Sequence, residues 1–584
     1  MLTATARSGS PFSILAVPNP LASGAVALTE RALGIEQLER LYQRFRTLPG
    51  DPWDRALEVL RVSVEVTGDL EVPATGPLLV VANHPLGGLD GVALLKLLKP
   101  HRPDTRLMAS PVFLRIPEFR PHLVESGLQA CALDGAARHL AASGCVACFP
   151  AGDASFPVDP AWDPALARLA QETGASALPI CFEGAGSPFQ PAKLLHPTLR
   201  TALFAKDILK RQGSRVRVAA GKVIPGRRLA ALGAEQATTV LRNHITVLQS
   251  RLEEPSPRVA HLGSGDPPIA EPQEPAVLAG EIEGLPRQSL LATGGGLEVW
   301  VARAQQMPHM LLELGRERER AFRAVGEGTG TGCDVDRFDE WYLHLVLWDP
   351  ARRCLAGSYR MGPTDEILAQ RGKGGLYSQT LFHISLGLLE KLDPALEMGR
   401  SFLREGYQGT HGPLMLLWKG IGRWLLQNPR YGRLFGAVSI SDAYNPVSRA
   451  LMARWANRHL RFKGAFPMQV VPRRPYPAPL KGEAKGLPGL LEGFDALDEA
   501  VSLIEGDKGV PVLFKHYARL GGRFAGFNSD PAFGDVLDGL VVVDLAHTDP
   551  RLLAVYMGKE QAAAFQARHL ARTARRAGPM RTQA

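Results

Sequence analysis

The chain has 584 residues, of which 45% are hydrophobic and 21% charged, and its formal net charge is +9. This length exceeds what one hydrophobic core supports and predicts about three or four domains. The composition is that of a soluble globular protein, and no apolar run reaches the ~18 residues that cross a bilayer. The N-terminus lacks the pattern of a signal peptide, so we expect a cytoplasmic protein.

The positive charge favours an anionic partner, which includes a membrane surface, a nucleic acid or an acidic carrier protein. The basic residues do not alternate with aromatic ones and no zinc-finger spacing occurs, which argues against nucleic acid. Six cysteines form no disulfide framework. Cys145 and Cys148 lie inside one apolar run without a second metal-ligand pair. We therefore predict buried thiols and no metal site.

The N-terminal half alternates apolar runs with helical periodicity, which indicates an α/β fold. Residues 1–54 are expected to be irregular and then helical, with helices over 24–46 and 52–61. Their apolar faces suit either a membrane interface or the cover of a following sheet. From Val62 to residue 250 the chain reads as strands and helices of an α/β domain.

The stretch NHPLGGLDG follows the apolar run 78–82 and carries two residues with chemical potential. His84 leaves the end of a buried strand, and Asp90 follows after two glycines. A histidine oriented by a carboxylate is what a general base for an alcohol requires. An ordinary turn is the alternative interpretation, because Pro and Gly are turn residues.

Two further predicted strands, 144–149 and 175–183, also run into glycine-containing loops, FPAGDAS and GAGSPF. In an open α/β sheet, ligands bind outside the carboxyl ends of the strands. We therefore expect these loops and NHPLGGLDG to converge on one pocket.

NHPLGGLDG, FPAGDAS and LPICFEGAGS, in this order, resemble the three sequence blocks of the PlsC-type glycerolipid acyltransferases over about residues 55–250. The resemblance implies that His84 takes the proton of an attacking hydroxyl while Asp90 orients its ring. The His–Asp spacing is one residue longer than is usual in that family. The residues implied in substrate contact are Asn83, Gly87, Gly88, Phe149, Pro150, Gly152, Asp153 and Pro179.

The second block has Ala154 where the family has an arginine that grips the acceptor's phosphate. Because guanidinium is the natural bidentate ligand of phosphate, its loss predicts an acceptor without phosphate.

The rest of the chain divides by composition. Residues 251–285 are rich in Pro, Glu and Gly and are expected to be a linker. Residues 286–475 return to helical and strand patterns and are expected to form a second catalytic domain. Residues 476–584 are expected to be its C-terminal extension with a basic tail.

The second half carries a spaced series of charged residues. Their order resembles the acyl-homoserine-lactone synthase branch of the GNAT-like N-acyltransferases. YSQTLFHIS and LEMGRSFL resemble blocks of the N-acyltransferases that make lyso-ornithine lipid. The resemblance implies that Glu397 is the proton acceptor. The residues implied in substrate contact are Arg318, Phe322, Asp336, Asp339, Arg360 and Arg400. In a regular strand Glu397 and Arg400 lie on opposite faces unless a bulge intervenes.

The two halves together resemble the bifunctional ornithine-lipid synthases. This implies that the C-terminal half N-acylates an amino acid with a 3-hydroxyacyl group and that the N-terminal half esterifies the hydroxyl. Ornithine is favoured, and glycine stays open. No bound cofactor is expected. Acyl carrier protein is favoured as thioester donor over coenzyme A, because the GNAT pyrophosphate loop is not cleanly present. We expect the protein to be cytoplasmic and peripheral on the cytoplasmic face of the inner membrane, where its basic tail meets anionic lipid.

Two alternatives stay open. In the first, one half is catalytic, for example as a glycerolipid acyltransferase, and the other binds lipid or carrier without catalysis. In the second, the chain is a non-enzymatic, hemolysin-like membrane-binding protein, which needs none of His84, Asp90 or Glu397.

Overall fold

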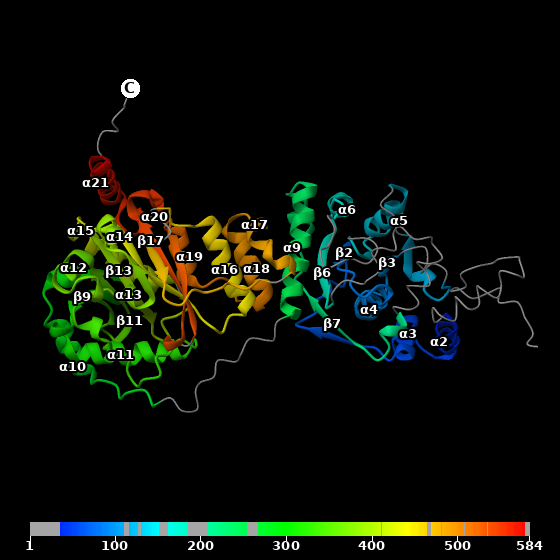
Figure 1. Cartoon of the computed structure of the whole chain (residues 1–584), viewed down its shortest axis with the longest axis horizontal. Helices are drawn as coiled ribbons and strands as arrows, with labels where there is room; N and C mark the ends of the chain where they lie inside the picture. Colours follow the sequence, from blue (N-terminus) through cyan, green and yellow to red (C-terminus); the bar gives the residue numbers. More distant parts are fainter. Residues whose placement is uncertain are drawn as a thin grey trace, which may run out of the picture. The chain divides into compact units, whose positions relative to one another are not determined.

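The computed structural model describes most of the chain: residues 35–109, 116–125, 130–150, 162–184, 208–253, 267–409, 411–463, 469–480, 482–506, 508–533 and 535–577. The chain divides into two compact units. Unit 1 comprises Met1–Pro255 and Leu480–Lys508, and unit 2 comprises Ser256–Pro479 and Gly509–Ala584. Both units are mixed α/β (Figure 1), as the sequence predicts.

Unit 1 contains a seven-stranded sheet in the order β1-β7-β6-β2-β5-β3-β4. Neighbouring strands are parallel except for β6 and β7. The strands are β1 (Ser63–Thr67), β2 (Leu78–Ala82), β3 (Arg106–Ala109), β4 (Leu123–Glu125), β5 (Cys145–Cys148), β6 (Ser176–Phe182) and β7 (Arg215–Ala220).

Helices cover both faces of this sheet. Every residue of β2 is buried, and successive residues enter different cores: Leu78 and Val80 pack in one, Leu79 and Val81 in the other. This is why β2 reads as a continuous apolar run instead of an alternating one. The helices are α2 (Ile35–Thr47), α3 (Pro52–Leu60), α4 (Gly88–Leu98), α5 (Ala130–Ala141), α6 (Ala165–Thr173), α8 (Gly226–Ala230) and α9 (Ala234–Glu253).

Unit 1 is completed by a segment from far along the chain, which we call the return segment, Leu480–Lys508. It contains α17 (Leu487–Leu490) and α18 (Gly493–Glu505), which both pack against α9 (Figure 1). Glu499 of α18 pairs with Arg228 and lies 3.4 Å from His244 of α9. The grouping differs from the expected extension 476–584, because part of that extension belongs to unit 1.

Unit 2 contains an eight-stranded sheet in the order β16-β17-β14-β13-β11-β10-β9-β8. All neighbours are antiparallel except β13 and β14, which are parallel. The strands are β8 (Leu290–Gly294), β9 (Leu297–Arg303), β10 (Leu343–Asp349), β11 (Cys354–Pro363), β13 (Ala395–Leu403), β14 (Arg433–Ile440), β16 (Arg523–Asp530) and β17 (Val536–Asp544). The short strands β12 (Phe382–Ile384) and β15 (Val470–Pro472) pair with each other.

The helices of unit 2 include one inside the expected linker. Leu278 and Ile282 of α10 (Pro275–Glu283) are buried with Met310 and Leu314 of α11 (Pro308–Arg323). Part of 251–285 is therefore core, because its apolar residues recur at helical spacing after a proline start. The other helices are α12 (Thr364–Arg371), α13 (Ser378–Leu381), α14 (Leu386–Leu392), α15 (His411–Gln427), α16 (Pro446–His459), α19 (Val512–Arg519), α20 (Pro550–Met557) and α21 (Lys559–Ala577).

A bulge interrupts β13 beside β11. Arg360 pairs with Gly399 while Ser358 pairs with Phe402, so β13 has one residue more than β11 between these pairs. Arg400 lies in this bulge with φ of 48°, in the left-handed region that non-glycine residues rarely adopt. In a regular strand Glu397 and Arg400 would lie on opposite faces, and the bulge that changes this is present in the structure.

Within the described ranges, none of the helices combines the length and the apolar character needed to traverse a bilayer.

Candidate active sites

The first candidate site lies where β2 ends in unit 1. His84 follows β2 by two residues, and Asp90 lies in the first turn of α4. The Nδ1 atom of His84 is 2.8 Å from Oδ2 of Asp90. Gly87, with φ of 67°, makes the turn that brings the two together. The spacing of five intervening residues therefore permits direct contact.

Asp90 is placed to fix the tautomer of His84. Its Oδ2 also accepts a hydrogen bond of 2.8 Å from the backbone N–H of Leu86, and its side chain is fully buried. Burial raises the pKa of Asp90, and the hydrogen bond with His84 lowers it in part. A carboxylate on Nδ1 keeps the proton there, which leaves the Nε2 lone pair of His84 as the proton acceptor.

The imidazole of His84 is held against an aromatic ring from the second block. The centroids of His84 and Phe149 are 4.2 Å apart, with an interplanar angle of 18°. The side chain of His84 is 15% exposed, which leaves an edge for a substrate. The ends of β2 and β5 therefore converge, as expected for loops at the carboxyl edge of the sheet.

The remaining residues implied in substrate contact differ in their surroundings. Asn83 is buried, and its amide exchanges hydrogen bonds of 2.9 and 2.7 Å with the backbone of Phe182. Asn83 thus ties β2 to β6. Gly88 begins α4, and Pro150 and Pro179 are buried. Gly152 and Asp153, like Ala154, lie outside the described residues.

The second candidate site surrounds Glu397 of β13. Its Oε1 accepts hydrogen bonds from the hydroxyl and the backbone N–H of Ser378, and its Oε2 accepts from the hydroxyl of Tyr342 and the backbone N–H of Tyr377. Glu397 is 2% exposed. Burial raises the pKa of Glu397, which suits a group that takes up a proton.

Tyr342 and Ser378 were not singled out from the sequence. Both are buried and both hydroxyls donate to Glu397. Ser378 lies in the YSQTLFHIS block, so the resemblance contained a signal for it. Tyr342 lies in neither of the blocks that carry the resemblance, so no sequence signal pointed to it.

Arg318 and Arg360 are the centre of a buried ion network. Arg318 is 3.2 Å from Asp339, and Arg360 is 3.0 Å from Asp339 and 2.7 Å from Asp336. The side chains of Arg318, Arg360 and Asp339 are at most 1% exposed. Although burial alone would raise the pKa of Asp339, the two guanidiniums lower it. These surroundings favour a structural role for these three residues over the substrate contact implied by resemblance.

Arg400 and Asp336 are more accessible. Arg400 is 10% exposed and its guanidinium lies 3.4 Å from Asp334 and 3.5 Å from Asp336, which is 24% exposed. The bulge turns Arg400 toward the Glu397 side: its guanidinium is 5.0 Å from the ring centroid of Tyr377, whose N–H donates to Glu397. Phe322 instead packs edge-on against Phe533 at 5.2 Å.

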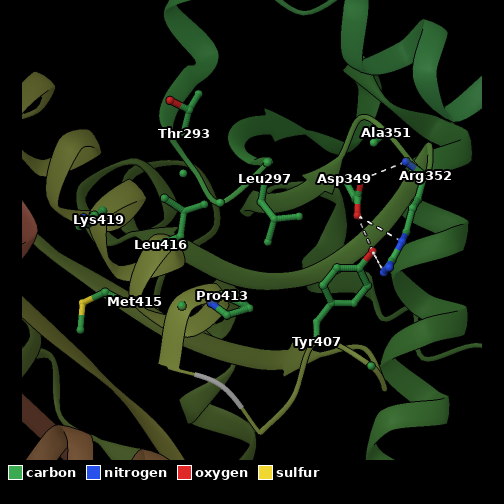
Figure 2. A pocket seen from close by; sticks show the side chains of 15 residues that line it. Thr293, Leu297, Asp349, Ala351, Arg352, Tyr407, Pro413, Met415, Leu416 and Lys419 are labelled. Atoms are coloured by element: carbon green, nitrogen blue, oxygen red, sulfur yellow. Dashed lines mark hydrogen bonds and ion pairs between the residues drawn. The ribbon is translucent and has the colours of Figure 1, made fainter.

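Unit 2 also contains a cavity of about 660 Å³. Its walls are the β8–β9 turn, the β10–β11 turn, the loop after β13 and the first turns of α15 (Figure 2). On one wall, the Tyr407 hydroxyl donates to Asp349 at 2.7 Å and accepts from Arg352 at 3.3 Å, as Figure 2 shows. The cavity includes Tyr407 and Gly412 of YQGTHGP, the stretch nearest to the expected pyrophosphate loop.

Residues 318–419 match the acetyltransferase (GNAT) domain family. The match covers Arg318, Glu397 and Arg400 and lies wholly within unit 2. The expectation of a GNAT-like fold in the second half is therefore confirmed.

Among curated proteins, the glycine N(alpha)-acyltransferase of Phocaeicola vulgatus is 32% identical over 30% of this chain and 57% of its own length. That of Bacteroides thetaiotaomicron is 31% identical over 28% of this chain and 51% of its own length. The chain thus spans between half and three-fifths of these two relatives. The lyso-glycine lipid O-acyltransferase of Phocaeicola vulgatus is 27% identical over 30% of this chain and 68% of its own length.

Among solved structures, the 1-acyl-sn-glycerophosphate acyltransferase PlsC from Thermotoga maritima is similar at 17% identity and a TM-score of 0.25, over 36% of this chain and 78% of that one. The GNAT-domain match and the relatives named for N- and O-acyl transfer fit the expected fusion of a PlsC-like with a GNAT-like acyltransferase domain.

Proposed function

We propose that the chain is a bifunctional lipid acyltransferase. Unit 2 transfers a 3-hydroxyacyl group from a thioester to the amine of an amino acid, and unit 1 transfers a second acyl group to the hydroxyl of that product. The observation that carries the proposal is the presence, in one chain, of a His84–Asp90 dyad and a GNAT domain around a buried carboxylate. Relatives named for N- and O-acyl transfer support the pairing.

In unit 1, the acceptor hydroxyl attacks the thioester carbonyl while His84 Nε2 takes its proton. The C–O bond forms, the C–S bond breaks, and the imidazolium returns the proton to the leaving thiolate. Asp90 stabilises the imidazolium and keeps Nδ1 protonated. The acceptor carries no phosphate, because Ala154 replaces the family's arginine.

In unit 2, a neutral amine attacks the thioester carbonyl, the C–N bond forms and the thiolate leaves. Glu397 accepts the released proton. Since both carboxylate oxygens already accept hydrogen bonds, the proton reaches Glu397 through the hydroxyl of Ser378 or Tyr342. Arg400 holds the carboxylate of the amino acid. Ornithine is the favoured acceptor and glycine, the substrate named for two relatives, is its competitor.

The donor is an acyl thioester, and we favour acyl carrier protein, whose acidic surface suits the net charge of +9. The cavity beside α15 has a volume typical of a ligand site and presents Arg352 and Lys419, which suits the phosphate of a pantetheine arm. We also place the protein on the cytoplasmic face of the inner membrane, where an anionic surface meets its basic tail.

The test is lipid analysis of cells that lack these lipids and express the wild type, His84→Ala or Glu397→Gln. We expect a diacyl amino-acid lipid from the wild type, the monoacyl lipid from His84→Ala and neither from Glu397→Gln. Gln is chosen because Ala would leave four buried donors without an acceptor. The control is the exposed His101→Ala, which should behave as wild type.

If neither the wild type nor any variant changes the lipids of these cells, the non-enzymatic, membrane-binding alternative is favoured. Monoacyl lipid from the wild type, without diacyl product, would leave unit 2 as the single catalytic half.

A further inference from the structure

A second group of carboxylates lies on the face of the unit 2 sheet that carries Glu397. Glu397 pairs with Phe435 of β14, and further along β14 Ser439 pairs with Asp538 of β17. Residues directly opposite share a face, and so do residues two or four apart on one strand. Asp538 therefore lies on the same face as Glu397.

The strands β13 and β14 are paired over Ala395–Glu397 and Arg433–Phe435. Asp538 lies beyond this paired stretch, in register with Ser439 on one side and Asn528 of β16 on the other. Asp538 therefore lies beside the part of the sheet in which β13 and β14 are no longer paired.

Asp538 is nine-tenths buried, with 6% of its surface exposed. Among the described residues, no hydrogen bond or ion pair reaches its carboxylate, although buried carboxylates almost always have such partners. Burial raises the pKa of Asp538 well above its usual range, and the nearby carboxylates of Asp530 and Glu327 raise it further. Glu327 is itself held on this face by Ser439, whose hydroxyl donates to it at 2.8 Å.

Within the described part of the chain, the cation whose charge lowers the pKa of Asp538 is Arg400. Its guanidinium already lies 3.4 and 3.5 Å from Asp334 and Asp336. Arg400 therefore shares its charge among several carboxylates and does not neutralise Asp538. A buried carboxylate surrounded by like charge gains most from a bound cation.

We propose that Asp538, flanked by Glu327 and Asp530, is a specificity subsite that holds the second ammonium group of a diamino acid acceptor. The α-carboxylate of this acceptor lies at Arg400 and its reacting amine on the Glu397 side. Arg400 links the two regions, because its guanidinium is 5.0 Å from the ring of Tyr377 and its charge acts on Asp538. Glycine has no group for this subsite.

This inference rests on the proposed N-acyl transfer. In this proposal Asp538 discriminates between acceptor amino acids and takes no part in the acyl transfer itself. Replacing the carboxyl group of Asp538, which ionises when the ammonium group binds, should therefore reduce transfer to diamino acids and leave transfer to glycine at its wild-type rate. A residue that merely supports the fold would affect both acceptors equally.

The test measures kcat/KM of the purified full chain for ornithine, lysine and glycine with a 3-hydroxyacyl-carrier-protein donor. We expect the wild type to prefer ornithine to glycine, and Asp538→Asn to lower kcat/KM for ornithine by about 10- to 100-fold, mainly through KM. Glu327→Gln should lower it in the same direction by less. The control is Asp535→Asn, an exposed aspartate on the same hairpin, which should change neither acceptor.

The outcomes separate the two proposals. N-acylation of glycine by the wild type at least as efficient as that of ornithine, or equal loss of both acceptors in Asp538→Asn, overturns the subsite. Absence of N-acyl product with every amino acid overturns the proposed function itself. Retained glycine transfer in Asp538→Asn also shows that the variant is folded.

Discussion

The two candidate sites differ in how their key carboxylates are used. Asp90 has one oxygen engaged by His84 and by one backbone N–H, and the imidazole that it orients is partly exposed. Glu397 accepts four hydrogen bonds and is buried beside a network of arginines and aspartates. The first site is a pair of side chains where a strand ends. The second site is embedded in a buried network that also supports the fold.

This difference predicts that substitutions separate activity from stability in unit 1 and couple them in unit 2. Asp90 is buried but engages, among the described residues, only His84 and one backbone N–H, so a substitution that keeps its size changes the packing little. A member of a buried ionic network leaves uncompensated charges when it is removed. The four predictions below test this contrast, from the largest expected effect to the smallest.

Asp90→Asn should lower kcat for O-acyl transfer on the order of 10³-fold, because the amide does not enforce the Nδ1–H tautomer of His84. Stability should change little, since the side chain keeps its size. The measurement is steady-state kinetics on the monoacyl lipid, with N-acyl transfer by the same preparation as internal control. A parallel drop in both activities would contradict the separation.

Arg318→Ala should destabilise unit 2 by about 3–5 kcal/mol, because Asp339 and Asp334 lose a fully buried partner. Urea unfolding of the full chain measures this. The matched control is Arg320→Ala on the same helix; Arg320 is 47% exposed, so its loss should cost about 1 kcal/mol or less. Equal effects of the two substitutions would show that the network does not stabilise the unit.

His344 should make the stability of unit 2 depend on pH. Burial lowers the pKa of His344 to about 4, below the ~6.5 of an unfolded chain. The folded state therefore favours the neutral imidazole. This contribution is complete above pH ~6.5 and is lost as the pH falls toward ~4, by up to about 3 kcal/mol.

Unfolding free energies at pH 7.5 and 4.5 for the wild type and His344→Gln measure this effect. The variant should lose less stability than the wild type between the two values. The exposed His383→Gln should follow the wild type. An unchanged pH dependence in His344→Gln would exclude His344 as its source.

Phe149→Leu should have the smallest effect. Its ring stacks on His84 at 4.2 Å, and such contacts contribute about 0.5–1.5 kcal/mol. We expect O-acyl transfer to fall by about 2- to 10-fold in kcat/KM, with N-acyl transfer unchanged. A loss as large as that of Asp90→Asn would mean that Phe149 does more than hold the ring.

The same contrast explains what could be predicted from the sequence. His84 and Asp90 are six residues apart, so a strand end, two glycines and a helix start suffice to bring them together. The partners of Glu397 come from Tyr342 and from Ser378, and the orientation of Arg400 depends on a bulge against β11. Spacing along one strand carries no information about a bulge whose cause lies in the neighbouring strand.

The fold class was predictable because hydrophobic periodicity is local. Which of the two units an element packs into could not be predicted from its sequence. Helix α18 shows the same amphipathic pattern whichever surface it covers, so nothing in its sequence indicates that it packs against α9. The helix α10 was missed because its Pro- and Glu-rich flanks resemble a linker.

The return segment has a consequence for the folding of the protein during its synthesis. Residues up to Pro255 emerge first, but the helices that complete their unit emerge only after all of Ser256–Pro479 has been synthesised. At ~5–20 residues per second this takes roughly 10–45 s. During that interval the surface of α9 that α17 and α18 later cover is without its cover, so the nascent unit 1 stays incomplete and open to non-native contacts until the return segment emerges.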